Sequence, residues 1–110
     1  PDLVITSIAG VTNVTLPSGA AQTYSVTITN TGSGPSGSFV NTFTGPDGVE
    51  TDLGTVSNLN AGESIVLTVN ATYTVAGSFT LRARADTGNQ VTEVSEVNNN
   101  ASLQVTVTGP

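Results

Sequence analysis

The chain contains no cysteine, histidine, lysine or tryptophan, and each absence removes a class of function. Without cysteine there are no disulfides, no thiolate metal ligands and no cysteine nucleophile. Without histidine the commonest general base is missing, and a Ser-His-Asp triad cannot form. Glu93 and Glu96 could in principle act as a carboxylate pair on a glycoside, but so small a domain offers little cleft. We therefore expect a protein that is not an enzyme.

Positive charge is almost absent as well. Arg82 and Arg84 are the only cationic residues, whereas the chain has eight acidic residues, so the net charge is −6. Two arginines cannot build the basic surface that nucleic acids or anionic membranes require. No apolar run approaches the roughly 18 residues needed to span a bilayer. The sequence therefore predicts no nucleic-acid partner and no direct membrane insertion.

What the chain does have is an alternation of apolar and polar residues with a period of two. Tyr24, Val26 and Ile28 would share one face of a strand, and the serine and threonine between them would share the other. No stretch has the spacing of a long helix. The same alternation recurs in residues 65–71, 79–85 and 101–107, with weaker versions in residues 3–8, 39–43 and 53–56.

Turn residues separate these segments. Gly45-Pro46-Asp47-Gly48 predicts a type I turn that joins two strands into a hairpin. Short strands at this spacing predict an all-β protein, an immunoglobulin-like or fibronectin-III-like sandwich of about seven antiparallel strands. We expect one domain over residues 1–108, with residues 109–110 as linker. The targeting and anchoring segments are expected to lie elsewhere in a larger protein.

The segment between the last two predicted strands is rich in carboxylates and amides. Calcium prefers six to eight oxygen ligands of this kind, which makes the segment a candidate calcium site. The alternative, which we favour, is structural: Asx side chains bond to their own backbone in turns and hold the connection in place. We therefore expect that the domain requires no cofactor, and a bound calcium ion is the alternative. The candidate ligands are Asp86, Asn89, Glu93, Glu96 and Asn98.

Two further pairs of residues have both a structural and a binding interpretation. Arg82 and Arg84 lie on one face of a predicted strand, and we expect them to pair with acidic neighbours more readily than with a ligand. Tyr24 and Phe79 occupy inward positions, so we expect them in the core rather than stacked on a carbohydrate. Both pairs thus favour a structural role.

Five groups of residues form a recognisable set of motifs: Pro1–Ile5, Asn30–Gly34, Leu59–Ser64, Ala76–Ala83, and the positions Asp86, Asn89, Val91, Glu93, Glu96, Asn98 and Asn99. Through these motifs nearly the whole chain resembles the CARDB family, the cell-adhesion-related domain found in bacteria and archaea. Asn41 departs from the pattern, because it interrupts the apolar face of residues 39–43. The resemblance implies an extracellular module, often in tandem, of cell-surface proteins and secreted hydrolases, without catalytic activity.

Two functions follow as hypotheses. The first is an adhesive or spacer domain whose partners are neighbouring domains of its parent protein and a cell-surface protein or carbohydrate. It predicts termini at opposite ends of the sandwich. The second is an accessory module of a secreted hydrolase that binds carbohydrate or peptide, and it predicts an exposed aromatic platform or a polar groove. Aromatic residues make up only 5% of the chain, which favours the first.

Overall fold

A computed structural model describes residues 2–17, 20–86 and 100–109, and these residues form eight β-strands and no helix. None of the described segments is therefore a helix that could cross a membrane. The strands are β1 (Leu3–Ala9), β2 (Asn13–Thr15), β3 (Ala21–Asn30), β4 (Phe39–Thr44), β5 (Glu50–Val56), β6 (Ser64–Thr72), β7 (Gly77–Ala85) and β8 (Asn100–Thr108).

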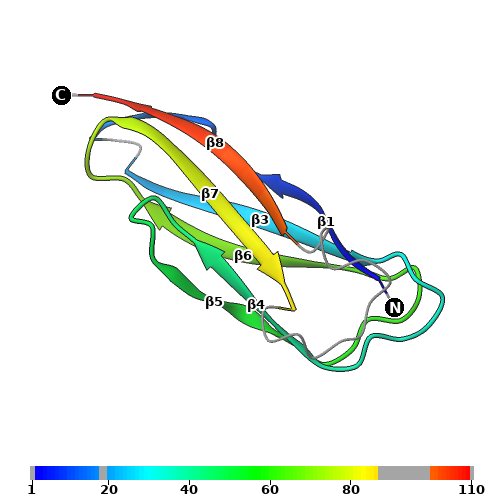
Figure 1. Cartoon of the computed structure of the whole chain (residues 1–110). Coiled ribbons are helices and arrows are strands. Elements are labelled where there is room, and N and C mark those ends of the chain that lie inside the picture. Colours follow the sequence, from blue (N-terminus) through cyan, green and yellow to red (C-terminus); the bar gives the residue numbers. More distant parts are fainter. Residues whose placement is uncertain (1, 18–19, 87–99, 110) are drawn as a thin grey trace.

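The strands form two sheets that pack face to face, as the sequence predicted (Figure 1). One sheet has three strands in the order β1-β3-β6, and the other has five in the order β2-β8-β7-β4-β5. The first strand and the last strand thus belong to different sheets. Neighbours in both sheets are antiparallel except β2 and β8, which run parallel.

The predicted sandwich of about seven antiparallel strands is confirmed, and the structure adds two details to it, an eighth strand and one parallel pair. Both concern β2, whose three residues Asn13, Val14 and Thr15 are too few to display an alternation. Only its pairing with β8, more than ninety residues later in the sequence, makes this segment a strand.

Irregular register explains why two of the predicted strands, β1 and β5, looked weak. The pairing of β1 with β3 shifts between Ile5 and Ser7, and the pairing of β4 with β5 shifts after Asn41. A β-bulge inserts an extra residue and changes the face of the residues that follow it. Leu53 and Val56 are therefore both buried although their spacing is odd.

The core lies between the sheets and is built from the alternating residues of both. In β3 the inward side chains Tyr24, Val26 and Ile28 are fully buried, and the residues between them are more exposed. In β7, Leu81 and Ala83 are buried in the same way. The β4–β5 connection is the predicted turn, in which the Gly48 N–H donates to the Gly45 carbonyl over 3.1 Å.

The domain is a rod with principal dimensions of 50 × 21 × 20 Å. Its N-terminal and C-terminal ends lie at opposite ends of the long axis (Figure 1). This is the arrangement that the spacer hypothesis predicts.

Candidate functional site

Asn30, at the end of β3, joins three segments at the end of the rod where the chain begins. Its side chain is fully buried. The Oδ1 atom accepts hydrogen bonds from the N–H groups of Asp2 and Gly32, both over 3.1 Å. The Nδ2 atom donates to the carbonyls of Gly34 and Leu59, over 2.8 and 2.9 Å. The amide thus makes four hydrogen bonds, which is its full capacity.

Asn41, which interrupts an apolar face in the sequence, has a similar role in the other sheet. It is fully buried in β4, donates to the Gly54 carbonyl over 3.0 Å and accepts from the Asp86 N–H over 3.3 Å. The side chain thereby links β5, β4 and the residue after β7. A polar residue at an inward strand position was the signal of this role in the sequence.

Of the candidate calcium ligands, Asp86 is the one that the structure describes. It is buried, and its φ of +52° ends β7 in the left-handed region that Asp adopts more readily than most residues. Among the described residues, no three acidic side chains gather closely enough to hold a metal ion. The other candidates, Asn89, Glu93, Glu96 and Asn98, lie outside the described residues.

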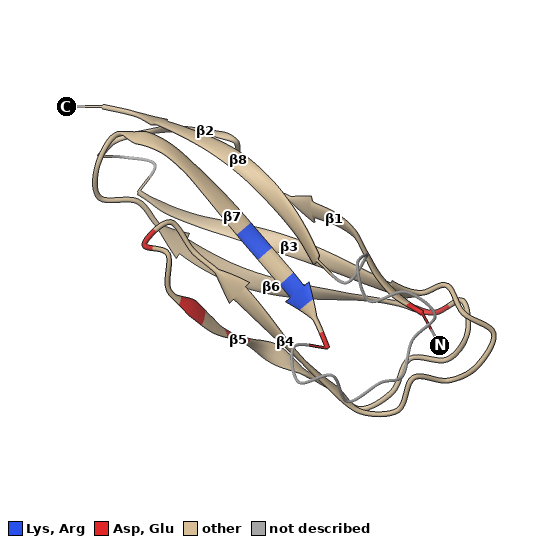
Figure 2. Ribbon diagram, in the orientation of Figure 1, with Lys and Arg blue, Asp and Glu red and all other residues tan. Residues whose placement is uncertain are grey.

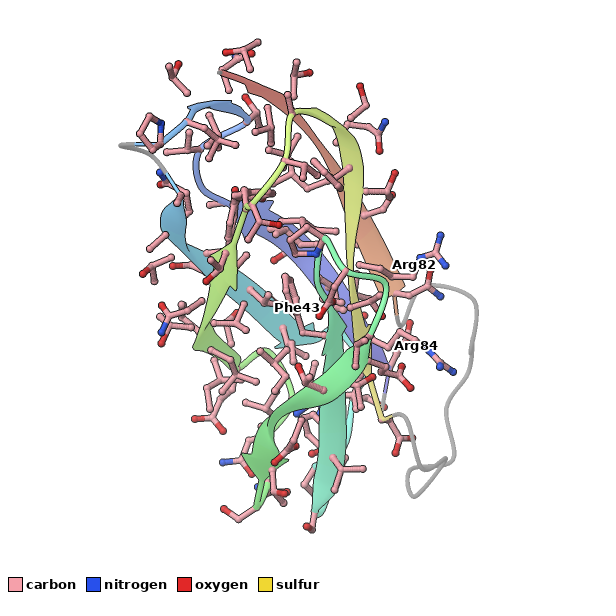
Figure 3. The ribbon with its side chains drawn as sticks, turned by 90° about the vertical axis from the view of Figure 1, so that its left-hand side faces the viewer. Phe43, Arg82 and Arg84 are labelled. Carbon is pink, nitrogen blue, oxygen red and sulfur yellow. The ribbon has the colours of Figure 1, made fainter. Side chains whose placement is uncertain are left out.

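The two arginines lie on β7 of the five-stranded sheet (Figure 2), and both side chains are exposed. Figure 3 shows Arg82 and Arg84 pointing outward from β7, away from the interior position of Phe43. Arg84 forms an ion pair with Glu50 over 3.3 Å, as expected from the sequence. Because both side chains are 42–49% exposed, we ascribe to this pair no more than about 1 kcal/mol of stability.

The chain has five aromatic side chains, two tyrosines and three phenylalanines, and four of them are buried in the core. Tyr24, Tyr73, Phe39 and Phe43 are buried. Phe79 is half-buried and packs against Tyr73, with the ring centroids 5.8 Å apart. The predicted core position is thus confirmed for Tyr24, whereas Phe79 is partly buried and packs against the core. None of the five rings is fully exposed as a stacking platform would require.

A buried pair of hydroxyl groups joins β3 and the residue after β6, which belong to the three-stranded sheet, to the link between β1 and β2. The Tyr24 hydroxyl donates to the Val11 carbonyl over 2.7 Å and lies 2.7 Å from the Tyr73 hydroxyl. Since Tyr24 has one hydroxyl proton and gives it to Val11, Tyr73 must be the donor between the two rings. Burial, and then the hydrogen bond to Tyr24, raise the pKa of Tyr73 well above its ordinary value of 10.0.

This direction of donation predicts unequal effects of removing the two hydroxyl groups. Tyr24→Phe leaves the Val11 carbonyl and the Tyr73 hydroxyl without their partners, so we expect a loss of about 2–3 kcal/mol of unfolding free energy. Tyr73→Phe removes one donor and leaves the Val11 bond intact, so we expect about 1 kcal/mol. Urea denaturation of both variants measures the difference; equal losses would contradict the proposed donor order.

Two small hollows lie where the β4–β5 turn faces the end of β6. Their volumes are about 160 and 210 Å³, and they share Pro46, Asp47 and Thr72 in their walls. Pockets for organic ligands have volumes of roughly 300–1,000 Å³, so these hollows are small for such a role. Neither contains the polar side chains of Asn30 or Asn41.

The domain is an immunoglobulin-like β-sandwich. Its two sheets enclose the core, β2 and β8 pair in parallel within the five-stranded sheet, and buried polar groups tie neighbouring segments together. The chain belongs to the CARDB family, whose model matches residues 1–103. The family suggested by the sequence motifs is thereby confirmed. No match was found among curated proteins.

Solved structures agree with this assignment. The CARDB domain of a Pyrococcus furiosus protein, crystallised in complex with di-metal ions, is 31% identical with a TM-score of 0.83, over 98% of this chain and 89% of that one. A domain of a Methanosarcina acetivorans protein, provisionally named as a cell surface protein, is 33% identical with a TM-score of 0.79, over 97% and 91%. A PKD domain of an M14-like peptidase from a Thermoplasmatales archaeon shares the fold at 19% identity, with a TM-score of 0.58 over 98% and 97%.

Proposed function

We propose that this domain is a non-catalytic extracellular spacer and adhesion module of a larger cell-surface or secreted protein. The observation that carries the proposal is the rod shape, 50 Å long, with the two ends of the chain at opposite ends (Figure 1). A domain with this geometry extends a chain by its full length and leaves both ends accessible to neighbouring domains. The cell-surface name of the Methanosarcina acetivorans relative supports the proposed location.

Small-angle X-ray scattering of one copy and of two copies joined in tandem tests the spacer role. We expect the second copy to lengthen the particle by about the 50 Å of one rod. Two rods packed side by side would leave the maximum dimension nearly unchanged and would contradict the proposal. Antibody labelling of intact cells that express the parent protein tests the extracellular location, and labelling only after lysis would refute it.

A ligand-binding role in a secreted hydrolase receives less support. Stacking on sugars needs exposed aromatic rings, but four of the five aromatic side chains are buried in the core and the fifth, Phe79, is partly buried against it. A glycan array with reproducible binding would reverse this preference.

Calcium stabilisation is a second proposal, favoured by the di-metal complex of the Pyrococcus furiosus relative. Asp86 would supply one carboxylate, together with Asn89, Glu93, Glu96 and Asn98 of the same segment. We expect calcium to raise the midpoint of thermal unfolding by several degrees relative to chelator. The shift should shrink in Asp86→Asn, and identical midpoints with calcium and with chelator would refute the site.

A further inference from the structure

We propose that the β2–β8 pair is a mechanical clamp, which lets the domain resist tension applied between its two ends. The proposal rests on the spacer function and adds a property to it. A spacer between an anchored protein and a bound partner is pulled along the line that joins its termini. In this domain that line follows the long axis of the rod (Figure 1).

The parallel orientation of β2 and β8 decides how tension acts on them. Pulling the N-terminus draws β2 back toward its own beginning, and pulling the C-terminus draws β8 toward its own end. Because the strands run in the same direction, they are drawn in opposite directions along their axes. In a parallel pair the hydrogen bonds are slanted, but they still run from one strand to the other across those axes. The bonds are therefore loaded in shear and share the force.

The clamp is short but closely bonded. The Thr106 N–H donates to the Thr12 carbonyl and the Leu16 N–H donates to the Thr108 carbonyl, both over 2.8 Å. These bonds bracket the register in which Val14 lies opposite Val107. Both valines are buried in the core, so sliding the strands would also expose apolar surface.

Two further contacts hold the segments that lead the force into the clamp. At the start of the chain, the Thr31 N–H donates to the Asp2 carbonyl over 2.8 Å, and the antiparallel β1–β3 pair follows. Between β1 and β2, the buried Tyr24 hydroxyl holds the Val11 carbonyl. Tension at the N-terminus therefore reaches β2 through segments that are themselves fixed to β3.

Shear and unzipping differ in how many bonds break at a time. In shear all bonds of the pair must fail together, whereas force on adjacent strand ends breaks them one after another. Forced unfolding is governed by the unfolding barrier rather than by equilibrium stability. We therefore expect the unfolding force of the same folded protein to depend on the direction of pulling.

Single-molecule force spectroscopy tests this directly, because the chain has no native cysteine to interfere with attachment. In one arrangement the protein is pulled by its two termini. In the other it is pulled between the C-terminus and Thr15→Cys, an exposed position opposite Thr108 in the register. We expect the end-to-end arrangement to need a several-fold higher force. Equal forces in the two directions would overturn the clamp.

A matched pair of substitutions tests whether the resistance to force comes from the β2–β8 pair. Val14→Ala in β2 and Val56→Ala in β5 remove the same methyl groups from side chains that are 2% and 4% exposed. We expect similar shifts of the denaturation midpoint, but a lower end-to-end unfolding force for Val14→Ala alone. Equal loss of force in both variants would refute the assignment to β2–β8. The tandem scattering experiment is independent, since a rod without directional resistance would remain a spacer and lose only the clamp.

Discussion

Asn30→Ala is expected to lower the free energy of unfolding by about 3–5 kcal/mol, a large share of the roughly 5–15 kcal/mol typical of a whole domain. The substitution removes an amide that saturates two N–H groups and two carbonyls. Each buried polar group left without a partner costs about 1–3 kcal/mol, and water at the rim of the site recovers part of that loss. Chemical denaturation of the purified domain measures the change.

Asn58→Ala is the matched control for Asn30→Ala. Asn58 also accepts and donates hydrogen bonds, from the Gly37 N–H and to Asn60, both over 2.9 Å, but it is exposed. Water replaces those bonds, so we expect a loss below about 1 kcal/mol. Asn30→Asp keeps the shape but lacks both amide donors, so it should be destabilised at neutral pH. Comparable effects of Asn30→Ala and Asn58→Ala would show that Asn30 is not a structural junction.

Gly10→Ala is expected to cost about 3 kcal/mol, at the upper end of the usual range for overpacking a core. A Cβ at position 10 would lie 2.3 Å from Cδ1 and 2.7 Å from Cε1 of Tyr24. The ring has no room to retreat, because it is fully buried and its hydroxyl is fixed between Val11 and Tyr73. The added methyl group must therefore displace either the ring or the backbone that leads into β2.

Gly34→Ala provides the same chemical change in open space. No heavy atom lies within 4 Å of the Cβ it would carry, and its carbonyl remains available to Asn30. We expect a change within about 0.5 kcal/mol, or a slight gain because alanine restricts the unfolded chain. Thermal unfolding of the two variants side by side tests the prediction, which fails if Gly10→Ala is as stable as Gly34→Ala.

The strands with regular alternation were predictable from sequence because their environment repeats every two residues. In β3 and β7 each inward residue meets the opposite sheet, so the apolar face is continuous. The polar residues of the interior were harder to interpret. Asn41 was visible as an interruption, but the groups it binds, Gly54 and the residue after β7, come from distant parts of the chain. Its role is a property of three strands together.

The sequence by itself determined the fold class, the family and the absence of histidine and cysteine chemistry. These depend on composition, on local periodicity and on motifs that can be read in order along the chain. Only the tertiary structure decided that β2 exists and that it runs parallel to β8. It also decided which groups Asn30, Tyr24 and Gly10 contact. Each of these depends on groups brought together from distant parts of the sequence. A three-residue strand is too short to show an alternation of apolar and polar residues. The roles of a fully hydrogen-bonded amide and of a glycine packed against a ring depend on their partners, so the sequence pattern alone does not reveal them.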